Sequence, residues 1–165
     1  MRILGIDPGF KATGYGIVDY DGRSLESLKV CEAGTIEPNE RDLLQNRILR
    51  VYKNLDGLLA EYKPDVMVLE KLYAHYKHPL TASKLGHVRG VICLLCAQRN
   101  IKLVEHSVKR IRVALVGNGS ANKEQTKSVV AHVLKIDEKK LVTDASDALA
   151  LALGYIHIHC RGSGI

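Results

Sequence analysis

Two acidic residues stand at the ends of strand-like segments, where a carboxylate is costly unless something binds it. Asp7 directly follows the apolar run 3–6, and Glu70 directly follows the apolar run 66–69. Moving an unpaired charge out of water costs several kcal/mol of free energy. If the two segments are parallel neighbours, both carboxylates lie at the carboxyl edge of one sheet, where ligands bind in α/β folds.

Two further acids, Asp144 and Asp147, are three residues apart at the expected start of a helix, so both project to one face. The residues that follow, 148–156, are almost wholly apolar, which predicts a helix buried against the sheet. Four carboxylates gathered there would repel one another unless cations lay among them. Oxygen ligands without His or Cys favour Mg²⁺ or Mn²⁺. Two such ions can hydrolyse a phosphodiester, one activating water and the other stabilising the leaving oxygen.

The acids also have simpler interpretations, which the residues alone leave open. Asp7 could cap the turn that begins at Pro8 and Gly9 through its own backbone. Asp144 could be a helix N-cap, and acids in a first turn interact well with the helix dipole.

Positive charge is concentrated in the second half of the chain. Residues 1–70 hold 9 Lys or Arg and 12 Asp or Glu, whereas residues 71–165 hold 15 and 6. The 34 residues from 71 to 104 contain no acid. A solvated face usually mixes charges of both signs, so this asymmetry indicates an anionic partner, of which nucleic acid is the commonest. A basic surface without a partner is the alternative.

Length and composition bound the class of protein. With 165 residues and 46% hydrophobic content, we expect one globular domain over 1–160 and a short tail over 161–165. We expect neither a membrane span nor a signal peptide, which favours a cytoplasmic protein. Cys93 and Cys96 form a lone Cys-x-x-Cys in an apolar segment, where one helical face would bury both, and zinc is not expected.

Hydrophobic periodicity predicts alternating strands and helices. We expect strands over 3–6, 13–18, 25–36, 66–69 and 101–104, and helices over 40–62, 80–99, 108–116, 123–134 and 144–158. The first three strands should be antiparallel, with a hairpin signal at Asp21 and Gly22. The later alternation implies parallel pairing with helices on both faces, which is an α/β fold.

Five segments carry a resemblance over nearly the whole chain. They read ILGIDPG at 3–9, VLE at 68–70, KLGHVRG at 84–90, VGNGSANK at 116–123 and DASDALA at 144–150. In this order and spacing the chain resembles the RuvC family of crossover-junction endodeoxyribonucleases. The resemblance implies a ribonuclease-H-like fold with a five-stranded mixed sheet. It also implies a homodimer that resolves Holliday junctions by paired symmetric nicks in DNA recombination and repair, and it suggests a branch-migration motor complex as a partner.

The resemblance further implies roles for individual residues. The metal-binding catalytic acids would be Asp7, Glu70, Asp144 and Asp147, with two Mg²⁺ ions expected. Lys123 matches a basic residue near the scissile phosphate. Arg112 matches a second functional basic position, where the family often has Lys.

Further DNA contacts are expected in the basic segment. Tyr73 stands where the family commonly has Phe, and its ring could stack on an unpaired base at the junction centre. Alternatively, Tyr73 only closes its loop against the sheet. The remaining expected DNA contacts are Lys77, Lys84 and Arg89.

A homodimer would match the approximate two-fold symmetry of a four-way junction. Gly86 and Gly90 lie one helical turn apart and would allow another helix to approach closely. That neighbour could be the chain's own sheet or a partner subunit, and the resemblance favours a subunit interface around residues 80–95.

Three functions compete on the sequence alone. The first is a junction-resolving nuclease, the second a general ribonuclease-H-like nuclease acting on RNA–DNA hybrids or flaps, and the third a non-catalytic junction-binding protein. Only the resemblance favours the first over the second, whereas retention of all the acids argues against the third.

Overall fold

Five strands form one mixed sheet in a computed structural model that describes residues 1–71 and 79–160. The strands are β1 (Arg2–Asp7), β2 (Thr13–Asp19), β3 (Lys29–Ile36), β4 (Val66–Glu70) and β5 (Lys102–His106). Their order across the sheet is β3-β2-β1-β4-β5. β2 is antiparallel to both β1 and β3, whereas β1, β4 and β5 are parallel. The predicted five-stranded mixed sheet is confirmed.

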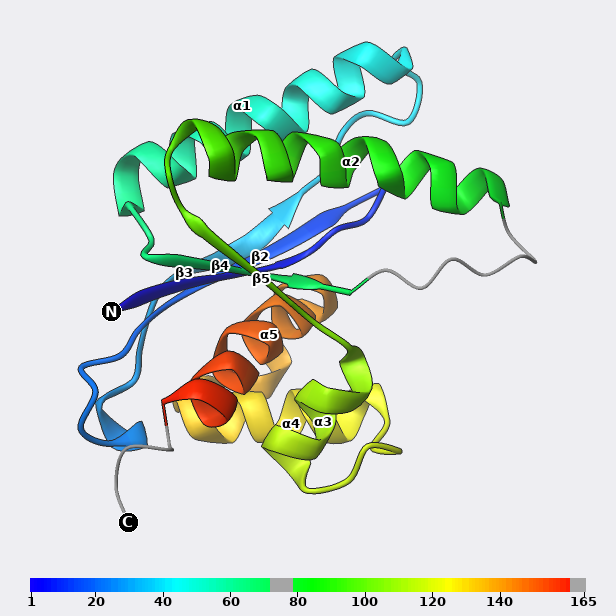
Figure 1. Ribbon diagram of the computed structural model, residues 1–165. Coiled ribbons are helices and arrows are strands. Elements are labelled where there is room, and N and C mark those ends of the chain that lie inside the picture. The colour runs from blue at the N-terminus through cyan, green and yellow to red at the C-terminus, as the bar shows by residue number, and fades with distance from the viewer. Residues whose placement is uncertain (72–78, 161–165) are drawn as a thin grey trace.

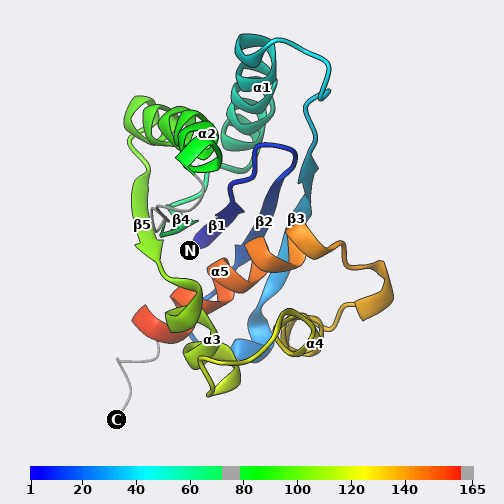
Figure 2. The same cartoon turned by 90° about the vertical axis from the view of Figure 1, so that its right-hand side faces the viewer.

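Helices cover both faces of this sheet (Figure 1). α1 (Leu44–Tyr62) and α2 (Pro79–Gln98) lie on one face. The opposite face is covered by α3 (Val108–Val116), α4 (Lys123–Leu134) and α5 (Thr143–His159). Figure 2 shows α5 directly against the sheet, with α3 and α4 packed on its outer side. Each face of the sheet therefore has its own hydrophobic core.

Strand alternation places both strand-end carboxylates on the α5 face. In β1, Ile3 belongs to the core beneath α5, and Asp7 follows four residues later on the same face. In β4, Val68 belongs to the same core, and Glu70 follows two residues later. Because β1 and β4 are parallel, the two acids end neighbouring strands at the same edge.

Glycines allow α5 to lie very close to the strands. A Cβ atom on Gly5 would lie 1.9 Å from the main-chain oxygen of Ala148, and one on Gly14 would lie 2.1 Å from that of Asp144. Either side chain would force the helix away from the sheet. Since Gly14 is the register partner of Asp7, the first turn of α5 lies over the end of β1.

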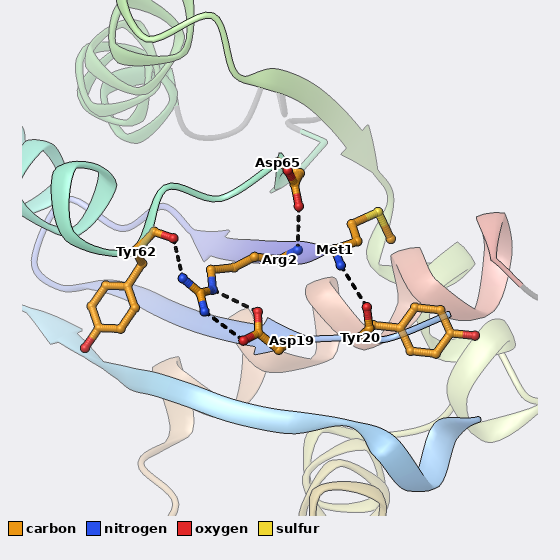
Figure 3. Close-up of polar contacts among 6 residues, drawn as sticks. All are labelled: Met1, Arg2, Asp19, Tyr20, Tyr62 and Asp65. Atoms are coloured by element: carbon orange, nitrogen blue, oxygen red, sulfur yellow. Dashed lines mark hydrogen bonds and ion pairs between the residues drawn. The ribbon is translucent and has the colours of Figure 1, made fainter. Parts of the chain in front are cut away.

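A polar cluster ties down the opposite end of β1 (Figure 3). The Arg2 guanidinium donates two hydrogen bonds to the Asp19 carboxylate, at 2.8 and 2.7 Å. It also donates to the main-chain oxygen of Tyr62 at 2.6 Å, and the Arg2 amide donates to Asp65 at 2.7 Å. These bonds join β1, β2 and the end of α1 at the edge remote from Asp7 and Glu70.

Two predicted element boundaries are wrong because polar residues close local turns. The third strand begins at Lys29, not at residue 25, since Leu25–Ser27 form a 3-10 turn whose Glu26 amide donates to the Ser24 hydroxyl at 3.1 Å. The first helix begins at Leu44 instead of residue 40, after a turn in which the Asn39 side chain accepts from the Arg41 amide at 3.0 Å. A second 3-10 turn, Glu138–Lys140, precedes α5.

α2 departs from two expectations. Cys96 is buried but Cys93 is exposed, so the prediction that both cysteines fill the core is wrong. The stretch Leu80–Gln98 is long and apolar enough to cross a membrane by length and composition alone, and only 22% of it is buried. One such helix is weak grounds for a span, and here Ile92 and Leu95 anchor α2 in the core. Leu80 and Leu94 are exposed on α2, and so are polar residues such as Lys84.

Candidate active site

A cavity of about 220 Å³ opens at the carboxyl edge of the sheet, on the α5 face. Side chains from five different elements supply its polar lining, namely Asp7, Glu70, Arg112, Lys123, Thr126 and Asp147. Apolar residues of α3 and α5 form the rest of the wall. The fold therefore gathers acids and bases that are far apart in the sequence.

The Asp7 carboxyl is the most perturbed acid of this cavity. Burial, and then the negative charges of Glu70 and Asp147, raise the pKa of Asp7 from 3.8 to about 7, while Lys123 opposes the rise. A proton on Asp7 relieves the repulsion in the absence of any other cation. A divalent ion would relieve it more completely, which is the electrostatic signature of a cation site.

Lys123 is aimed at the acids by the start of α4. The Asn122 side chain accepts from the Gln125 amide and the Gln125 side chain accepts from the Asn122 amide, a reciprocal cap that fixes the first turn. Lys123 Nζ donates to Asp147 Oδ2 at 2.9 Å. This hydrogen bond, with smaller contributions from the charges of Asp147, Asp7 and Asp144, raises the pKa of Lys123.

Asp144 lies in the first turn of α5, one turn before Asp147, and is not among the residues that line the cavity. The N-cap of α5 is Val142, so the interpretation of Asp144 as an N-cap is wrong. The turn after Asp7 is closed by Thr13, whose hydroxyl donates to the main-chain oxygen of Gly9 at 3.1 Å. Asp7 and Asp147 line the cavity, whereas Asp144 does not, although its charge acts on Lys123.

The donor set fits a hard divalent cation by its chemistry, because it consists of carboxylate oxygens. As the side chains lie, no three Asp, Glu, His or Cys side chains within 1–71 and 79–160 are close enough together to hold one ion. Asp147 is instead paired with Lys123. Binding would therefore require the carboxylates to rotate toward the ion, with water completing its coordination.

The other predicted DNA-contacting residues have different surroundings. Arg112 lines the cavity. Lys84 is exposed on α2, and its Nζ lies 5.3 Å from the centroid of the Phe10 ring. Arg89 is engaged inside the protein, where it donates to the main-chain oxygen of Glu70 at 2.6 Å. Tyr73 and Lys77 lie outside the described residues.

Sequence reasoning missed two features of the site. Thr126 lines the cavity one turn after Lys123, and this i, i+3 spacing on one helical face was the signal that could have identified it. Arg47 of α1 holds the loop after Asp7, because its guanidinium lies 3.8 Å from the Phe10 ring centroid and donates to the Phe10 main-chain oxygen at 2.7 Å. No local pattern marked Arg47.

Comparison with known proteins agrees with this geometry. Residues 3–155 match the family model of crossover junction endodeoxyribonuclease RuvC. The RuvC of Chloroherpeton thalassium is 38% identical over 153 residues, which cover 93% of this chain and 80% of that one. The RuvC of Halorhodospira halophila is 39% identical over 156 residues, covering 94% and 90%. Thermus thermophilus RuvC in complex with a Holliday junction substrate superimposes with a TM-score of 0.89 at 22% identity, covering 99% and 97%.

The mixed sheet, with an acidic cavity at the carboxyl edge of β1 and β4, defines a nuclease of the ribonuclease-H-like class. The family match then narrows this class. The chain belongs to the RuvC family of crossover junction endodeoxyribonucleases, and the family predicted from its motifs is confirmed.

Proposed function

We propose that this protein cuts Holliday junctions at the cavity on the α5 face, by hydrolysis that depends on divalent cations held by Asp7, Glu70, Asp144 and Asp147. Membership of the RuvC family supports the substrate and the reaction. The single observation that carries the chemistry is the crowding of Asp7 against Glu70 and Asp147, which keeps the pKa of Asp7 near 7. A divalent cation would stabilise these carboxylates in their ionised form, because it offsets the repulsion among them.

Each residue has a distinct task in this reaction. Bound Mg²⁺ or Mn²⁺, with two ions expected, would supply activation of the attacking water and stabilisation of the leaving oxygen. Lys123 would place its ammonium against the scissile phosphate and, when a cation binds, release Asp147 to face that cation. Arg112, which also lines the cavity, would hold a non-bridging phosphate oxygen with the planar set of donors of its guanidinium.

DNA binding is supported by the charge of the chain. The formal net charge is +6, and the excess of Lys and Arg over Asp and Glu is located in the residues after position 70. We expect Tyr73, Lys77 and Lys84 to contact the junction. Because these contacts displace counterions, binding should weaken steeply as salt is raised.

A homodimer assembled through α2 is part of the proposal. A Cβ atom at Gly86 or Gly90 would have nothing within 4 Å, so the described chain leaves both positions open to a second helix. Leu94 is 52% exposed on the same helix. Two copies related by a two-fold axis would match two equivalent strands of the junction. A branch-migration motor as partner and a cytoplasmic location stay predictions.

The decisive experiment uses a synthetic mobile four-way junction with a different label on each strand. We expect two symmetric nicks with Mg²⁺ or Mn²⁺ and none with EDTA, and little cleavage of a linear duplex or an RNA–DNA hybrid. Equal cleavage of the hybrid would favour a general ribonuclease-H-like nuclease. Tight junction binding with no cation-dependent nicking would favour a non-catalytic binding protein.

A further inference from the structure

Arg89 binds other residues of the protein, although it lies in the acid-free segment 71–104. Its side chain is 14% exposed. Nη1 donates to the main-chain oxygen of Glu70 at 2.6 Å, and Nη2 forms an ion pair with Glu105. Arg89 lies on α2, Glu70 ends β4 and Glu105 lies on β5. One side chain therefore ties a helix to two strands at the edge that carries the acids.

The backbone of Glu70 is paired with a neighbouring strand on one side only. The register pairs between β1 and β4 run to Ile6 and Leu69, so Glu70 lies one residue beyond them. On its other side Glu70 pairs with His106, and the Lys71 amide donates to the His106 oxygen at 2.8 Å. The hydrogen bond from Arg89 therefore holds the last main-chain carbonyl of β4. It comes from α2, which lies on the face of the sheet opposite the cavity.

We propose that Arg89 is a positioning residue, which fixes the main chain of Glu70 so that its carboxylate enters the cavity in the orientation that cation binding needs. This inference rests on the proposed function of the cavity. A guanidinium suits the task, because its rigid fork can hold a carbonyl and a carboxylate together. A lysine ammonium is a single point charge and could satisfy only one of them well. Arg89 acts through Glu70 and does not touch DNA.

The chain offers a matched control directly after the C-terminal end of α2. Arg99 also combines a carboxylate and a main-chain oxygen, since its Nε donates to Asp56 Oδ1 at 2.9 Å and its Nη2 to Asp56 O at 3.2 Å. These contacts join the end of α2 to α1 and involve no residue of the cavity. Arg89→Lys and Arg99→Lys therefore remove the same type of interaction at two places, while the charge is kept.

The test measures cation binding, junction binding and cleavage separately for both variants. Calorimetry with Mn²⁺ alone should show binding weakened several-fold in Arg89→Lys and unchanged in Arg99→Lys. Cleavage at saturating junction should fall between about 10- and 100-fold only in Arg89→Lys, the scale that a misplacement of about 1 Å produces. The Kd for the junction in EDTA, and its dependence on salt, should be unchanged in both.

Two results would overturn the inference. If the neutral variant Arg89→Gln weakens junction binding and lowers the salt slope by about one, with cleavage at saturation unchanged, Arg89 is a DNA contact. If Arg99→Lys loses as much Mn²⁺ binding and cleavage as Arg89→Lys, the effect is one of general stability. Failure of the proposed function would look different, since the wild-type protein would then bind Mn²⁺ without cutting the junction.

Discussion

The ammonium of Lys123 lies 2.9 Å from Asp147 Oδ2, so a base from α4 already neutralises an acid from α5 within the cavity. The Lys123 side chain is nevertheless 63% exposed, which leaves it free to turn toward a phosphate. This pairing explains why the acids can be gathered before substrate or cation arrives.

Lys123→Met should lower cleavage at saturating junction by about 100- to 1,000-fold, the usual cost of removing one group that stabilises developing charge. Thermal stability should change little, because an exposed ion pair contributes at most about 1 kcal/mol. Lys139→Met is the control, since it removes the same charge from an exposed position in Glu138–Lys140. A normal cleavage rate in Lys123→Met would exclude it from the chemistry.

Asp7→Asn should retain junction binding but lose cleavage by about 1,000-fold or more, because it removes a cation ligand. At pH 8, above the raised pKa of about 7, the wild-type residue is charged and repelled by Glu70 and Asp147. The cation-free variant should therefore melt a few degrees higher than wild type in differential scanning calorimetry at pH 8. Asp42→Asn, at an exposed turn, should match wild type in both assays.

The Arg2–Asp19 pair predicts a pH-dependent contribution to stability. The hydrogen bonds from Arg2 hold the pKa of Asp19 below its ordinary value of 3.8. A depressed native pKa stabilises the fold above pH 3.8, and this stabilisation is lost as pH falls through the lower native value. Asp19→Asn should therefore cost about 0.5–1 kcal/mol in urea unfolding at pH 7, and clearly less at pH 3.

The control for this pair is Glu40→Gln. Glu40 and Lys11 form an ion pair whose side chains are 62% and 80% exposed, so its loss should be close to neutral. An equal cost for Asp19→Asn at both pH values would contradict the assignment.

Leu94→Asp should convert the proposed dimer to monomers. A carboxylate in a closely packed helix pair would be desolvated without a partner. Light scattering should then report the 18.2 kDa mass of one chain, and nicking of the two opposing strands should become uncoupled. Leu49→Asp changes another exposed leucine, 47% exposed on α1, and should leave the mass unaltered. If the wild-type protein is itself a monomer, the proposed homodimer is contradicted.

Much of the fold followed from local patterns. The apolar runs ending in Asp7 and Glu70 predicted two strands, and both acids were expected at one edge if these strands were parallel neighbours. The pairing of Ile6 with Leu69 shows that they are. The two boundary errors, at Lys29 and Leu44, have a common reason. Hydrophobic periodicity does not register turns closed by polar side chains, such as the one that Ser24 caps.

The sequence by itself determined which residues could do chemistry and to which edge of the sheet they belong. It did so because strand alternation and helix periodicity are local rules, and because the motifs carry the family. Only the tertiary structure decided that Lys123 pairs with Asp147, that Asp144 is not part of the cavity lining and that Cys93 is exposed. It also showed that Arg89 donates to the main-chain oxygen of Glu70. The physical reason is that burial and side-chain pairing depend on elements distant in the chain, whose meeting no local pattern encodes.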